Sequence, residues 1–329
     1  MARRAPLSSL VLALAAACTA CAPQTAAAPK VAGTGPHGEP HATAPAAELV
    51  SPEVELDDHW KGLGAGCSYL APKGEVGGDD GGVDLVFHFH AGQMSEREMR
   101  ESGMNAVFVS CGFGIGTGPY AKAFTDPNRF GRIVDTVVRS LDESHDKKGL
   151  HVRRVALVSW SAGFAAIGRI LRVPRYYDMV DSVVLLDSLH AGYTGPKPHA
   201  AALGVERVDV KGLATFVRFA RDAARGDKTM VMTHSSIIPP DYASSAEATG
   251  AVLAELRVPT APAEETNERG MTLYYRADSG DLHVRGFRGR GPRDHFAHLH
   301  LIGEVLRSWV VPRWKRADRL VYTHAGEQR

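Results

Sequence analysis

Ser161 lies in a pattern that is typical of a serine nucleophile. The apolar run 155–160 leads directly into it, and a stretch of small residues with helical spacing, 162–171, follows. Ser159 and Gly163 are small enough for a tight turn between strand and helix, although glycine is usual at the first of these positions. Such a turn holds a hydroxyl above the edge of a sheet. The alternative is that Ser161 only caps an ordinary helix, because serine is a preferred N-cap residue.

Acyl transfer by a serine needs two further groups. An imidazole must take the hydroxyl proton, and a third group, usually a carboxylate, must hold that imidazole in one tautomer. The histidines near the C-terminus that could act as base are His295, His298 and His300. Asp187 and Asp241 follow apolar runs and could supply the carboxylate.

The elements that would position these residues alternate along the chain from about residue 51. Apolar runs predict strands at 83–90, 104–110, 153–160, 180–187, 228–234 and 282–287. Helical spacing predicts helices at 128–144, 162–171, 213–224, 244–256 and 296–310. This alternation predicts an α/β fold with a mostly parallel sheet and helices on both faces. No linker divides it, so we expect one domain, 51–329, in which the segment between Asp187 and Lys228 forms a short lid-like insertion.

From about residue 88 to the C-terminus, the chain resembles the α/β-hydrolases. Catalytic residues in that superfamily follow the chain order Ser, then Asp or Glu, then His. The resemblance rests on the turn around Ser161 and on the residues that follow in this order. It implies that Ser161 is the nucleophile. It also implies that the base is His295, which follows the last expected strand just before the closing helix, with His298 as the alternative base.

The resemblance leaves two positions for the acid. Some lipase-like members carry it at the position that Asp187 matches, directly at the end of an apolar strand. Many other members carry it one strand later, which points to the region of Asp241. That later loop has no acid close to its strand end, so we expect Asp187 to be the acid and keep Asp241 as the alternative.

The same resemblance implies an oxyanion hole made of backbone N–H groups. One donor would be Ala162, directly after the nucleophile. The other would come from the segment after an early strand, where the family often has His-Gly. Here Ala91 stands between His90 and Gly92, so the second donor is Ala91, Gly92 or Gln93.

Together these residues predict a serine hydrolase of esterase or lipase type that needs no cofactor. Its substrate would be a small-molecule or lipid-like acyl compound, and ester, thioester, amide and lactone substrates use the same groups. The net charge is +1 and acidic and basic residues are interspersed, so the sequence shows no basic region of the kind that binds nucleic acid.

Two other functions stay open at this stage. His88 and His90 stand two apart in an expected strand, so they would share a face and could bind zinc with the C-terminal histidines. A zinc-dependent hydrolase is therefore one alternative, and a catalytically inert binding lipoprotein with the same fold is another. A glycine-rich segment at 112–118 lies too far past its strand for a dinucleotide fingerprint, so we expect a loop beside the crevice.

The N-terminal residues predict export. Arg3 and Arg4 precede an apolar stretch, 7–17, of the length of a signal peptide. Small residues followed by Cys18 resemble a bacterial lipobox, with Cys21 and plain secretion as alternatives. We expect a signal peptide at 1–21, a tether rich in Ala, Pro and Gly at 22–50, and a lipid anchor on the membrane of the cell envelope. Otherwise the protein would be periplasmic or extracellular.

Two cysteines remain in the expected mature chain. Cys67 and Cys111 could form a disulfide in an oxidising compartment, or could be two separate buried thiols. The sequence leaves this pairing and the oligomeric state open.

Overall fold

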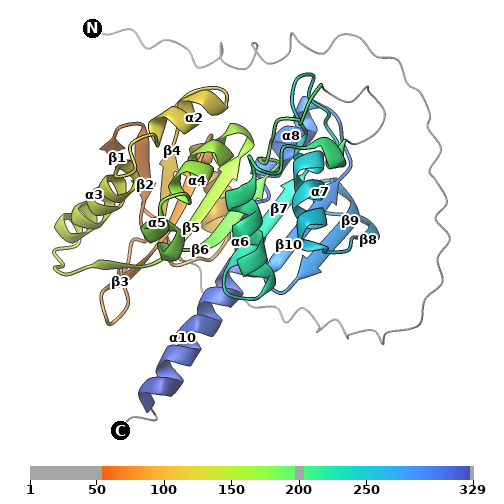
Figure 1. The fold of residues 1–329 in the computed structure, drawn as a ribbon. Helices are drawn as coiled ribbons and strands as arrows, with labels where there is room; N and C mark the ends of the chain where they lie inside the picture. The colour runs from red at the N-terminus through yellow and green to blue at the C-terminus, as the bar shows by residue number, and fades with distance from the viewer. Residues whose placement is uncertain (1–53, 197–203, 327–329) are drawn as a thin grey trace, which may run out of the picture. The chain divides into compact units, whose positions relative to one another are not determined.

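The computed structural model describes residues 54–196 and 204–326. Within them, ten strands form one sheet in the order β1-β2-β4-β3-β5-β6-β7-β10-β9-β8 (Figure 1). The strands are β1 (Lys61–Gly64), β2 (Cys67–Leu70), β3 (Gly82–Phe89), β4 (Val107–Cys111), β5 (His151–Trp160), β6 (Val180–Leu186), β7 (Thr229–His234), β8 (Ala261–Thr266), β9 (Thr272–Ser279) and β10 (Leu282–Phe287).

The sheet is mixed, which corrects the expectation of a mostly parallel one. The central strands, from β4 through β3, β5, β6 and β7 to β10, pair in parallel. Antiparallel pairs, β1 with β2 and β8 with β9, form the two edges. These edge strands are short or polar, and β1 and β8 are mostly exposed. Antiparallel strands tolerate a solvated face, whereas parallel strands are buried on both sides.

Helices cover both faces of the sheet. They are α1 (Glu96–Glu101), α2 (Thr117–Ala123), α3 (Arg129–Ser144), α4 (Phe164–Ile170), α5 (Pro174–Met179), α6 (Ala214–Ala224), α7 (Ser245–Leu256), α8 (Pro292–Leu299), α9 (Ile302–Val305) and α10 (Val311–Gly326). Alternate side chains of β3 enter opposite cores, since Leu85 and Phe87 pack with α2 to α7 while Val86 packs with α1 and α8 to α10. The fold is thus an α/β sheet with two apolar layers, as the alternation of elements predicts.

The closing helix differs from its prediction at 296–310. It begins earlier, as α8, because Pro292 suits the first turn of a helix. After α9 the chain forms a π-helical turn at Leu306–Val310 and continues as α10. His295 therefore lies in the first turns of α8, and the expectation that it precedes the helix is wrong.

The segment between Asp187 and Lys228 contains α6, which packs against the sheet beside β7. A short 3₁₀ turn, Val205–Arg207, precedes it, and residues 197–203 of the expected lid-like insertion lie outside the described residues.

Cys67 and Cys111 form a disulfide. They face each other in the antiparallel register of β2 and β4, with Cα atoms 4.2 Å apart. The structure thus decides between the two alternatives for these buried cysteines. The bond fastens the outer strand pair to the parallel centre of the sheet.

No helix in 54–196 or 204–326 combines the length and the apolar character that crossing a bilayer requires. The expected signal peptide, Cys18, Cys21 and the expected tether lie outside the described residues.

Candidate active site

Ser161 stands at the sharp turn between β5 and α4. Its backbone has φ +52°, a left-handed conformation that residues with a side chain rarely adopt. The turn continues as a single 3₁₀ turn, Ser161–Gly163, before α4 begins. Strained backbone of this kind persists where the surrounding structure holds it, often at functional sites.

The small residues on either side of Ser161 are required by close packing. A Cβ atom on Gly163 would lie 2.2 Å from the carbonyl oxygen of Phe89, so glycine lets the turn approach the end of β3. Ser159, which replaces the usual glycine, is fully buried, and its Oγ is 2.7 Å from the hydroxyl of Ser188. Ser188 in turn donates a hydrogen bond of 2.7 Å to the carbonyl oxygen of Ser161. These contacts fasten the turn to the segment after β6.

His295 and Asp187 are joined by a hydrogen bond. The Nδ1–H of His295 donates to Oδ2 of Asp187 at 2.7 Å, although the residues are 108 apart in the sequence. The other oxygen of Asp187 accepts from the backbone N–H of Ser235 at 3.0 Å. Burial alone would raise the pKa of Asp187, but the hydrogen bond from His295, the electrostatic effects of His298 and His295, and the hydrogen bond from Ser235 together outweigh it and hold that pKa below its usual range. The carboxylate is therefore ionised and fixes the tautomer of the ring.

Trp160, the residue before Ser161, holds His295 from the other side. Its indole N–H donates to the carbonyl oxygen of His295 at 2.9 Å, and the two rings stack with centroids 4.6 Å apart. Among the described residues no hydrogen bond joins the Ser161 hydroxyl to His295. In free enzymes such bonds are often long or poorly aligned and tighten when substrate binds.

The alternative acid and base are placed differently. Asp241 is exposed in the loop after β7, and the carboxylate bound to His295 is that of Asp187. His298 is fully buried in α8 and forms a hydrogen bond of 2.8 Å with Thr233 Oγ1. Burial lowers the pKa of His298 to about 4. His300 contacts α1 instead, with Nδ1 3.0 Å from a carboxylate oxygen of Glu98.

The segment that would supply the second oxyanion donor follows β3 and lies beside the Ser161 turn. His90 and Ala91 both have left-handed backbone, with φ +74° and +58°. Gly92 has no room for a side chain, because a Cβ atom there would lie 2.8 Å from Ser110 Oγ. The side chain of Gln93 turns away to Ser68, to which it donates at 2.7 Å. Ala162 is buried in the turn directly after Ser161.

The two histidines of the expected zinc pair do not share a strand face. His88 is fully buried in β3, both of its ring nitrogens lack hydrogen-bond partners, and burial lowers its pKa to about 3. His90 lies past the end of β3, where its left-handed backbone breaks the alternation of the strand. Across the described part of the chain, no three His, Cys, Asp or Glu side chains converge as metal ligands would.

Several residues of this site escape prediction from sequence. Trp160 directly precedes Ser161, and Ser188 directly follows Asp187. Their places in the sequence are therefore next to predicted site residues, but the sequence does not show which contacts their side chains make. Tyr120 is a further case: it enters from α2 and bonds to His90. Phe164, His190 and Tyr242 form an aromatic group nearby, with ring centroids 5.6 and 5.1 Å apart.

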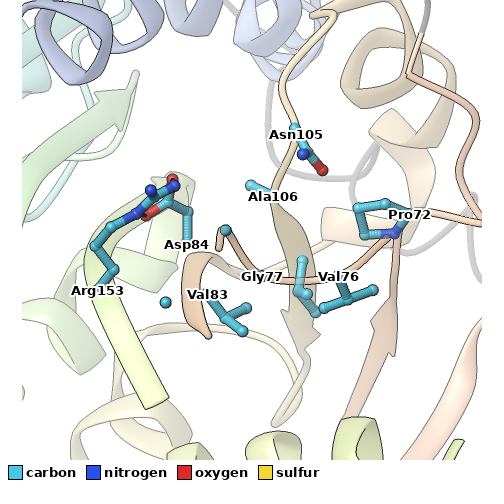
Figure 2. Close-up of a pocket in the computed structure, with 11 residues that line it drawn as sticks. Pro72, Val76, Gly77, Val83, Asp84, Asn105, Ala106 and Arg153 are labelled. Carbon is cyan, nitrogen blue, oxygen red and sulfur yellow. Dashed lines mark hydrogen bonds and ion pairs between the residues drawn. The ribbon is translucent and has the colours of Figure 1, made fainter. Parts of the chain in front are cut away.

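A cavity of about 70 Å³ lies where β3, β4 and β5 begin, at the ends of these strands opposite to the Ser161 turn (Figure 2). Asp84 and Arg153 lie side by side on its wall and form an ion pair of 2.6 Å. Asp84 also pairs with Arg154, which reaches Asp318 of α10. These ion pairs fasten α10 to the sheet.

Comparisons with known proteins give a likeness of fold only. No family model matches the sequence, and no curated protein matches it. Similar solved structures include the BES protein from Bacillus cereus, 12% identical over 81% of this chain and 98% of that one, with a TM-score of 0.40. A cold-adapted esterase from an Arctic intertidal metagenomic library is 12% identical over 74% and 87%, with a TM-score of 0.37. Haloalkane dehalogenase DbeA from Bradyrhizobium elkani USDA94 is 10% identical over 80% and 100%, with a TM-score of 0.41. Activity must be argued from the site itself.

Proposed function

We propose that the protein is a serine hydrolase that acts by acyl transfer on a carboxylic ester or a related acyl substrate. The observation that carries this proposal is the hydrogen bond between His295 and ionised Asp187, next to the strained turn that bears Ser161. Ser161 follows β5, Asp187 follows β6 and His295 lies in α8, so three separate elements bring these groups to the C-terminal ends of the central strands. Trp160 ties the base to the turn directly.

In the proposed mechanism, Ser161 Oγ attacks the acyl carbon while His295 Nε2 takes its proton. Asp187 keeps the ring oriented and stabilises the imidazolium that forms. The N–H of Ala162, with that of Ala91 or Gly92, donates to the oxyanion. His295 then gives its proton to the leaving group, and a water molecule, activated by the same ring, releases the acid and restores the serine.

A serine-directed fluorophosphonate distinguishes this function from an inert scaffold of the same fold. The purified protein is expected to label covalently at Ser161 and to hydrolyse at least one member of a panel of acyl esters of graded chain length. A chain that neither labels nor hydrolyses any ester would be a binding protein, and the proposal would be wrong.

Asp187→Asn is expected to lower kcat by about 10⁴-fold, because the amide cannot hold the required tautomer of His295. Asp241→Asn is the matched control, since Asp241 is exposed and the carboxylate bonded to His295 is that of Asp187. Kinetics on any active ester rank the two variants. A larger loss in Asp241→Asn than in Asp187→Asn would move the acid to the loop after β7.

We also propose that the chain is exported and lipidated at Cys18 or Cys21. The basic and apolar N-terminal segment supports this, and the Cys67–Cys111 disulfide fits an oxidising compartment. Mass spectrometry of the native N-terminus is expected to show a chain that begins with a lipid-modified cysteine. An unmodified chain that begins beyond Cys21 would remove the lipid anchor and leave export.

A further inference from the structure

The segment after β3 contains two strained residues in a row. His90 and Ala91 both carry a Cβ atom and both have left-handed backbone. Such a conformation is rare for residues other than glycine and persists only where neighbouring groups hold it. Under the proposed function, this same segment must present the N–H of Ala91 or Gly92 to the oxyanion.

The side chain of His90 is held on two sides. Tyr120, almost completely buried in α2, lies with its hydroxyl 2.8 Å from His90 Nδ1. That hydroxyl already accepts a hydrogen bond from the N–H of Phe113 at 3.3 Å, so its own proton is free to be donated to Nδ1. On the other side, the imidazole of His90 stacks on Trp160 with centroids 5.2 Å apart and planes 12° apart.

Trp160 therefore contacts two histidines. Its ring stacks with the rings of both His90 and His295, and it immediately precedes Ser161. Burial and the proximity of His295 lower the pKa of His90, which favours the neutral form of its ring. We call His90, Tyr120 and Trp160 the ring clamp.

We propose that His90 is a positioning residue for hydrolysis, and that the ring clamp holds the left-handed backbone of His90 and Ala91 so that the second oxyanion donor is in place. The inference rests on the proposed function and adds a role that the nucleophile, acid and base do not have. In this role, His90 neither transfers a proton nor binds a metal. Its effect is on the stabilisation of the transition state, since the donor matters only when negative charge develops.

The test compares two substitutions that remove the same ring. His90→Ala loses the clamp and keeps a Cβ atom that disfavours positive φ, whereas His90→Gly loses the clamp without that strain. We expect kcat to fall about 10- to 100-fold in His90→Ala, less than the loss of a whole donor, with little change in KM. His90→Gly should retain a higher kcat than His90→Ala. Tyr120→Phe, which removes only the hydrogen bond, should show the smallest loss.

A second measurement reads the oxyanion hole directly. A trifluoromethyl ketone, whose adduct with the serine carries an oxyanion, should bind more weakly to His90→Ala in proportion to the loss of kcat/KM. His283→Ala is the matched control, because His283 also stacks on a tryptophan, Trp309, at 5.3 Å, but near the start of β10 at the opposite edge of the sheet. It should leave kcat and ketone affinity unchanged. The thermal unfolding midpoint of each variant separates loss of fold from loss of position.

The outcomes separate this inference from the function on which it rests. A wild-type protein that neither labels nor hydrolyses any ester fails the proposed function, and the inference fails with it. Full activity in the wild type with unchanged kcat in His90→Ala overturns the inference alone. Equal losses in His90→Ala and His90→Gly would show that the backbone strain is irrelevant and would also overturn it. Loss of wild-type activity in a chelator would make His90 a candidate metal ligand and contradict the clamp.

Discussion

Ser161→Ala is expected to abolish covalent labelling by a fluorophosphonate and to lower kcat by about 10⁶-fold. In the proposed mechanism the substitution removes the atom that forms the acyl-enzyme, and loss of the serine or of the histidine of such a triad costs about as much as loss of all three members. The fold should survive, because alanine has the same Cβ atom as serine in the left-handed turn. Labelling followed by mass spectrometry, together with thermal unfolding, measures both effects.

Ser279→Ala serves as the control for this experiment. Ser279 is partly buried like Ser161 but lies at the end of β9, away from the turn. It should label and turn over as the wild type does. Labelling of Ser161→Ala at the wild-type rate would show that another residue is the nucleophile.

His295→Ala is expected to cost nearly as much as Ser161→Ala. Without the imidazole, no group takes the hydroxyl proton, and the carboxylate of Asp187 is left buried without its partner. Because the groups act as a unit, the double variant Ser161→Ala/His295→Ala should be no slower than either single variant. Single-turnover kinetics on an activated ester measure all three.

Two neighbouring histidines test whether the base is correctly placed. His300→Ala should change kcat only slightly, because His300 contacts Glu98 rather than Asp187. His298→Ala should lower the unfolding midpoint, since it empties a fully buried position bonded to Thr233, and should cost less activity than His295→Ala. A greater loss of activity per folded molecule in His298→Ala would place the base one helical turn further along α8.

The central elements of this fold could be predicted because burial leaves a periodic signal. Strand β10 matches its prediction at 282–287, and β5, β6 and β7 differ by one or two residues. The edges leave no such signal. Strand β8 reads Ala-Pro-Ala-Glu-Glu-Thr, which has no apolar alternation, and it is ordered by pairing with β9. Long-range pairing of this kind overrides local propensity.

The candidate site likewise combines features that have a local sequence signal with features that depend on long-range contacts. The turn at Ser161 is a local feature of strand, small residues and helix, so sequence reaches it. The hydrogen bond between Asp187 and His295 depends on how α8 packs against β7, the neighbour of β6, and residue spacing does not contain that information. The ring clamp is harder still to predict, because Tyr120 and Trp160 meet His90 from two other elements. A glycine-rich stretch before α2 indicated a loop there but gave no sign of the tyrosine that follows it.

The order of strands also bears on how the molecule is made. Strand β10 lies between β7 and β9, and α8, which carries the proposed base His295, follows it. A nascent chain that ends before β10 would contain the serine turn and Asp187 but not His295, and β7 would present an open edge to other chains. Such an intermediate would lack the proposed base and would be vulnerable to aggregation until residues 282–329 emerge and dock. Under the proposed function, we therefore expect hydrolytic activity to arise only when β10 and α8 have docked. If the chain is exported as proposed, a precursor that is kept unfolded would not hydrolyse acyl compounds in the compartment where it is made.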